Sequence, residues 1–67
     1  MSAYVEQSQF AKDRQLIAGI LRHLQSLHDW EMSFAYLMSE QLTNGKLLSS
    51  EQFETARRIS ERFFPSS

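Results

Sequence analysis

The sequence predicts an all-α fold: a helical hairpin of one long helix and one shorter C-terminal helix. Three observations lead to this prediction. The segment 9–43 contains no Pro and only one Gly. Apolar residues recur along it every three or four positions, as on one face of a helix. A helix-capping sequence, Ser49-x-x-Gln52, then opens a second apolar pattern that ends at Pro65, the only proline.

The segment 9–43 is predicted to form one continuous helix. Its heptad core positions are Phe10, Ile17, Leu24, Glu31 and Met38 at a, and Asp13, Ile20, Leu27, Phe34 and Gln41 at d. This spacing continues without a change of phase, which favours continuity. The alternative is a break at 26–29, where Asp29 could cap a new helix. Position N3 would then be Met32, so no capping box would form.

The connection is predicted at 44–49. Asn44-Gly45 is a stop signal, because Gly45 can adopt the left-handed conformation that ends many helices at the C′ position. Ser49 is the predicted N-cap of the next helix, and Gln52 completes a capping box. Leu48 and Phe53 flank this cap at the spacing of a hydrophobic staple.

The second helix is predicted at 50–64, followed by a tail at 65–67, so that residues 1–67 form a single helical domain. One face of this helix is apolar, and its residues are Phe53, Ala56, Ile59 and Phe63. The opposite face carries charges in i,i+4 pairs, such as Glu54 with Arg58, which support a solvated helix surface.

The two predicted helices differ in length, which favours a homodimer. At 1.5 Å per residue the 9–43 helix would span about 50 Å and the 50–64 helix about 22 Å. One short helix cannot cover the apolar face of the long one. We therefore expect two chains to pair in a four-helix arrangement. The expected interface residues are Ile17, Ile20, Leu24, Leu27, Trp30, Phe34 and Met38.

Glu31 is the one acidic residue at an a position from Ile17 to Met38, and two interpretations are open. It could pair in the dimer with His28 or Arg22 of the partner subunit and so specify the register. Alternatively, the helices separate locally and its carboxylate reaches water, which is the interpretation we favour.

Composition and charge exclude several classes. A net charge of −1 gives no overall attraction to nucleic acid or an anionic membrane. The longest apolar run, Leu16–Leu21, is far shorter than the about 20 residues of a membrane span. Residues 1–6 lack the basic and apolar regions of a signal peptide. We therefore expect a cytoplasmic protein with no membrane partner.

No residue constellation predicts catalysis or cofactor binding. The chain has no Cys, and its two histidines, His23 and His28, are five residues apart, which does not place them on one helix face. No Ser has a His and an acid at a spacing that suggests a nucleophile. We expect no enzyme activity, metal, cofactor or small-molecule substrate.

The preferred function is a small adaptor, inhibitor or regulator that binds a partner protein through a helical surface. Met32 and Tyr36 lie four residues apart on the side opposite the apolar stripe, with Asp29 and Glu40 beside them. Tyr and Met are enriched at protein interfaces. Phe64 is a second candidate partner-binding residue, at the end of the second helix.

Two alternatives remain open. The 50–64 helix could act as the recognition helix of a dimeric DNA-binding regulator, with phosphate contacts from Arg57, Arg58 and Arg62. Three acidic residues in the same helix, Glu51, Glu54 and Glu61, argue against this. The chain could also be a structural subunit of a larger assembly, with the apolar stripe as its docking face.

Overall fold

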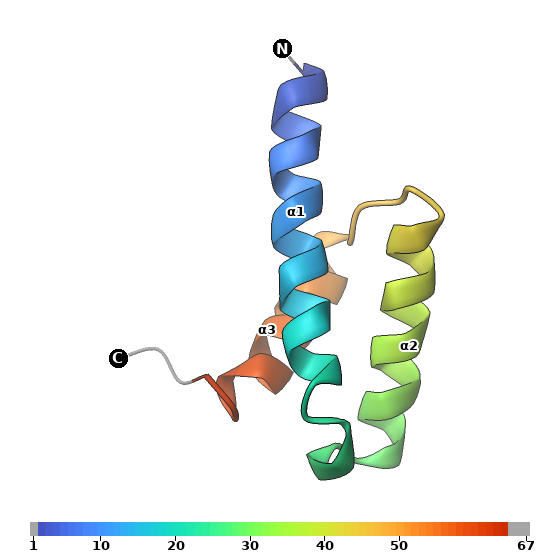
Figure 1. Cartoon of the computed structure of the whole chain (residues 1–67), viewed down its shortest axis with the longest axis vertical. Coiled ribbons are helices and arrows are strands. Elements are labelled where there is room, and N and C mark those ends of the chain that lie inside the picture. The colour runs from blue at the N-terminus through green and yellow to red at the C-terminus, as the bar shows by residue number, and fades with distance from the viewer. Residues whose placement is uncertain (1, 65–67) are drawn as a thin grey trace.

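The computed structural model describes the backbone of residues 2–64 and the side chains of residues 8–64. Three helices, α1 (Ser2–Leu21), α2 (Asp29–Thr43) and α3 (Ser50–Glu61), make up most of this range, with a short 3-10 turn, η1 (Leu24–Ser26), between α1 and α2 (Figure 1). Residues 2–64 contain no strand, so the described part of the chain is all-helical, as predicted. The predicted tail, 65–67, lies outside the described residues.

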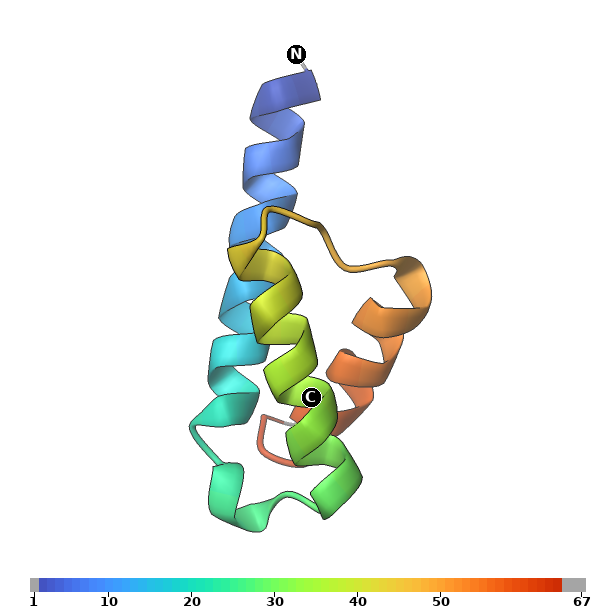
Figure 2. The same ribbon diagram turned by 90° about the vertical axis from the view of Figure 1, so that its right-hand side faces the viewer.

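The helices form a small three-helix arrangement with α1 at its centre. The chain reverses direction after α1, so that α2 lies antiparallel beside it (Figure 1). The 44–49 connection then spans from the end of α2 to the start of α3 (Figure 2). Helix α3 packs on α1 and makes fewer contacts with α2. The N-terminal turns of α1 extend beyond the other two helices (Figure 1).

The prediction of one continuous helix over 9–43 is wrong, because the chain breaks at 22–28. The break overlaps the alternative site, 26–29, up to residue 28, but its cap differs from the one considered. The N-cap is His28, which places Glu31 at N3. The His28 N–H donates to Glu31 Oε1 at 2.8 Å, so a carboxylate stabilises the start of α2.

The first helix also begins earlier than predicted, at Ser2 rather than Gln9. Residues 2–8 contain Ala, Glu and Gln, all good helix formers, and no Gly or Pro. The last helix ends at Glu61, three residues before the predicted end at Phe64. Residues 62–64 continue as a turn, in which the Phe63 and Phe64 N–H groups donate to the Ser60 carbonyl.

The buried core is assembled within one chain. Its apolar members are Ile17, Ile20, Leu27, Ala35, Met38, Leu42, Ala56 and Ile59. Four of the predicted dimer residues are therefore buried without a partner subunit, while Leu24 and Phe34 are partly buried against the core. The break explains this, because α2 folds back and covers α1. The length mismatch that favoured a dimer is thereby removed.

The 44–49 connection is built as predicted. Gly45 has a φ of 85°, and its N–H donates to the Leu42 carbonyl at 2.9 Å. The Lys46 N–H donates to the Gln41 carbonyl at 3.0 Å, which completes a Schellman motif. At the other end, the Gln52 N–H donates to Ser49 Oγ at 3.1 Å. The Ser49 N–H donates to Gln52 Oε1 at 2.8 Å, and this reciprocal pair confirms the capping box.

A buried aspartate fixes this connection to α1. Asp13 is 1% exposed, and its Oδ2 accepts a hydrogen bond from the Leu48 N–H at 3.0 Å. Its Oδ1 accepts from Gln9 Nε2 at 2.9 Å. A buried carboxylate is costly unless it is hydrogen-bonded. Its two bonds explain why a polar residue occupies a d position of the stripe.

Candidate functional site

Large apolar side chains are exposed mainly on α2. Among the described residues, those that are most exposed are Trp30 (57%), Tyr36 (55%), Leu37 (60%) and Phe64 (52%). The first three belong to α2 and are called here the α2 surface. The buried residues of α2 follow the spacing 31, 35, 38 and 42. Trp30 and Leu37, seven residues apart, therefore lie on one flank of the helix and Tyr36 on the other.

A groove separates α2 from α3 on the Trp30 flank. It has a volume of about 510 Å³, and its lining residues are Trp30, Glu31, Thr55, Arg58, Ile59 and Arg62. We call it the Trp30 groove. Ile59 and Glu31 are buried and form its floor. Farther along, Gln41 and Gln52 join α2 to α3 by reciprocal amide hydrogen bonds of 2.9 and 3.1 Å.

An ion pair at the floor of the groove joins α3 to the start of α2. Arg62 Nη2 donates to Glu31 Oε1 at 2.8 Å and to the Ser26 carbonyl at 3.2 Å. Burial raises the pKa of Glu31, but the His28 N–H and the Arg62 guanidinium outweigh it and lower the pKa below 4.5. The favoured expectation that Glu31 reaches water is wrong, since its partner is Arg62 of the same chain.

The three arginines named for DNA binding differ in their surroundings. Arg57 forms ion pairs with Glu54 and Glu61, and its guanidinium lowers the pKa of Glu54. Arg62 is engaged with Glu31. Arg58 is the most exposed, with 75% of its side chain accessible, and its Nε lies 3.6 Å from Glu54 Oε2. Balanced charge of this kind weakens the attraction to phosphate, and DNA binding stays an untested prediction.

The predicted Met32–Tyr36 patch is only partly present. Tyr36, Asp29 and Glu40 are exposed on α2. The placement of Met32 on an exposed face is wrong, because Met32 is partly buried and packs against the core. Because the chain breaks at 22–28, α2 does not keep the orientation about its own axis that one continuous helix would give it. The side of α2 that carries Met32 therefore faces the core.

Phe64 lies against α1 rather than beside the α2 surface. Its ring meets the His23 ring edge-on, with centroids 5.4 Å apart, and its Cε2 lies near Gly19. His23 also stacks on Phe63 at 4.3 Å, with an interplanar angle of 4°. These three rings hold residues 63–64 against the α1–α2 corner. Part of the Phe64 ring is therefore already used by the fold.

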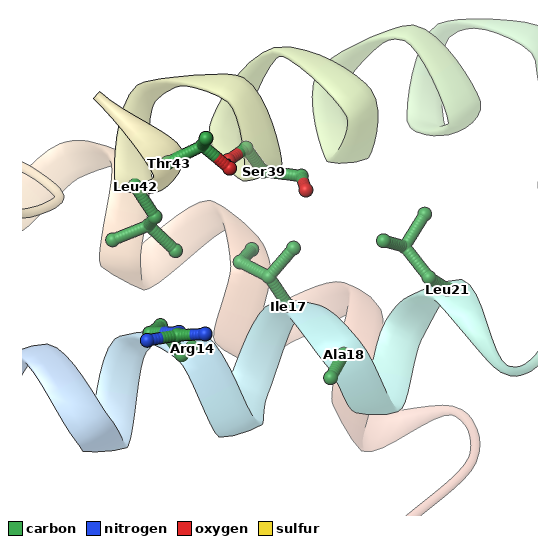
Figure 3. Close-up of a pocket in the computed structure, with 7 residues that line it drawn as sticks. All are labelled: Arg14, Ile17, Ala18, Leu21, Ser39, Leu42 and Thr43. Atoms are coloured by element: carbon green, nitrogen blue, oxygen red, sulfur yellow. The ribbon is translucent and has the colours of Figure 1, made fainter. Parts of the chain in front are cut away.

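A second, smaller groove of about 190 Å³ lies between α1 and α2. Its lining residues are Arg14, Ile17, Ala18, Leu21, Ser39, Leu42 and Thr43, contributed by facing turns of the two helices (Figure 3). Arg14 is the one charged member of this lining, and the two hydroxyl groups come from Ser39 and Thr43. The lining therefore offers no carboxylate or imidazole for acid–base chemistry.

Within residues 8–64, no three His, Asp or Glu side chains are grouped so that they could hold a metal ion. Across the described helices, none is long and apolar enough to cross a membrane. Comparisons with protein-family models, curated proteins and solved structures found no match. The function is therefore inferred from the geometry of the chain itself.

Two features of the site were missed at the level of sequence. Trp30 was expected in the dimer interface and Leu37 was not named as a site residue, although both are exposed on one flank of α2. The i,i+7 spacing of Trp30 and Leu37 was a visible signal. It became interpretable only after the break at 22–28 had placed the core face of α2 at residues 31, 35, 38 and 42.

Proposed function

We propose that this chain is a non-enzymatic protein-interaction module that binds a partner protein through the α2 surface. The observation that carries this proposal is the concentration of three of the four large exposed hydrophobics on one helix. Exposed aromatic and aliphatic side chains grouped in this way are typical of interaction sites. By occupying a partner's surface, this chain would act as an adaptor or an inhibitor.

Affinity capture with a matched pair of surface variants tests the proposal. The triple variant Trp30→Ala, Tyr36→Ala, Leu37→Ala removes the α2 surface without touching the buried core. A partner held by wild type in stoichiometric amount should be lost, because interface aromatics often contribute more than about 2 kcal/mol. Phe64→Ala, which removes an exposed aromatic elsewhere, should retain it. Retention by the triple variant with unchanged helical content contradicts the proposal.

The proposal changes the surface through which the predicted homodimer would form. Since most of the stripe is buried within one chain, we expect self-association to use the α2 surface, which carries three of the four large exposed hydrophobics among the described residues. Analytical sedimentation at micromolar concentration measures the oligomeric state directly. A dimer that the triple variant abolishes would identify a second copy as the partner, whereas a monomer would remove the homodimer prediction.

A further inference from the structure

We propose that the Trp30 groove receives an amphipathic helix of a partner protein, with an acidic residue of that helix bound by Arg58. This inference rests on the proposed function and specifies the chemistry of its partner. It uses the Trp30 flank of α2, and not the Tyr36 flank, as the contact surface.

The dimensions of the groove suit about two turns of a docked helix. Its lining on α3 extends from Thr55 to Arg62, and seven rises of 1.5 Å give a length of about 10 Å. A groove between two helices is the geometry in which amphipathic helices dock by i, i+4 and i+7 anchors. On α2, Leu37 lies on the same flank as Trp30 and about 10 Å farther along the axis, so it extends the apolar surface beyond the lining residues.

The floor accepts an apolar side chain without an electrostatic penalty. Ile59 supplies apolar surface, and the buried Glu31 carboxylate is already paired with Arg62 and the His28 N–H. Within residues 8–64, no buried side-chain nitrogen or oxygen lacks a hydrogen-bond partner. An incoming Leu or Phe would therefore cover no unsatisfied polar group, which is the usual cost of docking an apolar side chain.

The charges on the α3 side of the Trp30 groove indicate an acidic partner. Residues 55, 58 and 62 follow the i, i+3, i+7 spacing and line the same side of α3. Arg62 is engaged by Glu31, while Arg58 lies in a looser pair, with its Nε 3.6 Å from Glu54 Oε2 and 75% of its side chain exposed. An exposed guanidinium of this kind can turn its terminal N–H groups toward a carboxylate and donate to it bidentately.

The charges also orient the partner. Glu51, exposed and four residues before Thr55, lies on the same side of α3 toward its N-terminus. Arg58 and Arg62 thus line the groove at its Trp30 end, whereas Glu51 lies beyond the lining residues, toward the start of α3. We expect the acidic residue of the docked helix to lie at the Trp30 end, because the opposite orientation would place it beside Glu51.

Trp30 supplies the measurement, since it is the only Trp of the chain and lies in the groove. The probes are two synthetic amphipathic helical peptides without Trp that share one Leu face. One carries Glu beside that face and the other carries Lys. The full chain should bind the Glu peptide at least about tenfold more tightly. Trp30 emission should shift to shorter wavelength as the ring leaves water.

Two charge-reversal variants control for nonspecific attraction. Arg58→Glu should reverse the preference toward the Lys peptide. Arg14→Glu makes the same change of charge at an exposed position of α1, outside the groove, and should leave the preference unchanged. If Arg58→Glu lowers helical content, Arg58→Gln takes its place and should abolish the preference without reversing it.

The outcomes separate this inference from the proposed function. Equal binding of both peptides, binding of neither, or no shift of Trp30 emission overturns the acidic helix as occupant. So does a shift that grows with protein concentration alone, which would mean that a second copy fills the groove. If the triple variant still loses a captured partner in any of these cases, the proposed function stands and only this inference fails.

Discussion

The two corners of the molecule are made in different ways. The 44–49 corner is specified by residues inside it: Gly45 ends α2 in a left-handed conformation, and Ser49 with Gln52 caps α3. The 22–28 corner has no Gly or Pro, and its helix-compatible residues continue the apolar stripe. One corner can therefore be recognised from a few neighbouring residues, whereas the other cannot.

Residues far along the chain hold the 22–28 corner in place. Arg62 donates to the Ser26 carbonyl and to Glu31, and Phe63 stacks on His23. The 44–49 corner also has one remote contact, between Asp13 and the Leu48 N–H. The difference teaches that a break in a regular helical pattern can depend on remote contacts in addition to a local cap, here the His28 N–H to Glu31 bond. Substitutions at the two corners should consequently behave differently.

The largest effect is expected from the apolar anchor of the 22–28 corner. Leu27 is 8% exposed and belongs to the core. Leu27→Ala should lower the free energy of unfolding by about 2–5 kcal/mol, because it removes buried surface and leaves a cavity. Leu24→Ala, at a partly buried position of the same corner, should cost less. Urea unfolding of both variants measures this, and an equal or larger cost at Leu24 would contradict the packing.

The ion pair between α2 and α3 comes next. Glu31→Ala and Arg62→Ala should each cost about 1–3 kcal/mol, since each leaves a charged hydrogen-bonding group without its partner. The double variant should cost less than their sum, because the two side chains interact directly. Arg57→Ala is the control, and its exposed pairs should contribute under about 1 kcal/mol. Strict additivity in the cycle would show that the pair does not fix the corner.

The cap of α3 should have an intermediate effect. Ser49→Ala removes the acceptor of the Gln52 N–H and should cost about 0.5–2 kcal/mol in thermal or urea unfolding. Ser50→Ala, one position inside the helix, should be close to neutral. The Ser49 and Glu31 substitutions should add, because they act on separate corners. Strong coupling between them would mean that the corners are not independent.

The two glycines give opposite expectations. Gly45 has a φ of 85° and open space around its missing side chain, so Gly45→Ala should cost about 1 kcal/mol through backbone strain alone. Gly19 is helical, and a Cβ there would lie 3.5 Å from the Phe64 ring, an ordinary contact. Gly19→Ala should therefore be neutral or stabilising by up to about 1 kcal/mol. The melting temperatures of the two variants test this. A lower melting temperature for both, or a higher one for both, would contradict the conformations of Gly45 and Gly19.

The smallest expected effect is on the pH dependence of stability. The pKa of Glu31 is lowered below 4.5 in the folded chain, so near that pH the unfolded chain binds more protons. The stabilisation that ionised Glu31 provides is complete above the ordinary pKa of a glutamate. It is lost as the pH falls through the lowered pKa of Glu31 in the folded chain. Glu31→Gln should flatten the loss of stability below about pH 4.5. Glu54→Gln, at an exposed surface pair, should flatten it less, and the reverse order would contradict the burial of Glu31.

Much of the fold could be predicted from local chemistry. Helix propensity, the Asn44-Gly45 stop and the Ser49 cap act over four or five residues, so they can be recognised without tertiary information. The break at 22–28 could not be predicted in this way, because its stabilising partners are 36 residues or more away from Ser26 and His23. The exposed flank of Trp30 and Leu37 depends on that break and was missed for the same reason.

The sequence by itself determined that the chain is helical, where α2 ends, where α3 begins and that apolar residues recur at helical spacing. Tertiary structure alone decided that α2 folds back on α1, that Glu31 pairs with Arg62 and that Trp30 faces outward. The physical reason is the range of the interactions. Caps and turn conformations are satisfied within one turn of chain, whereas burial and ion pairing depend on which distant segment arrives to cover each face.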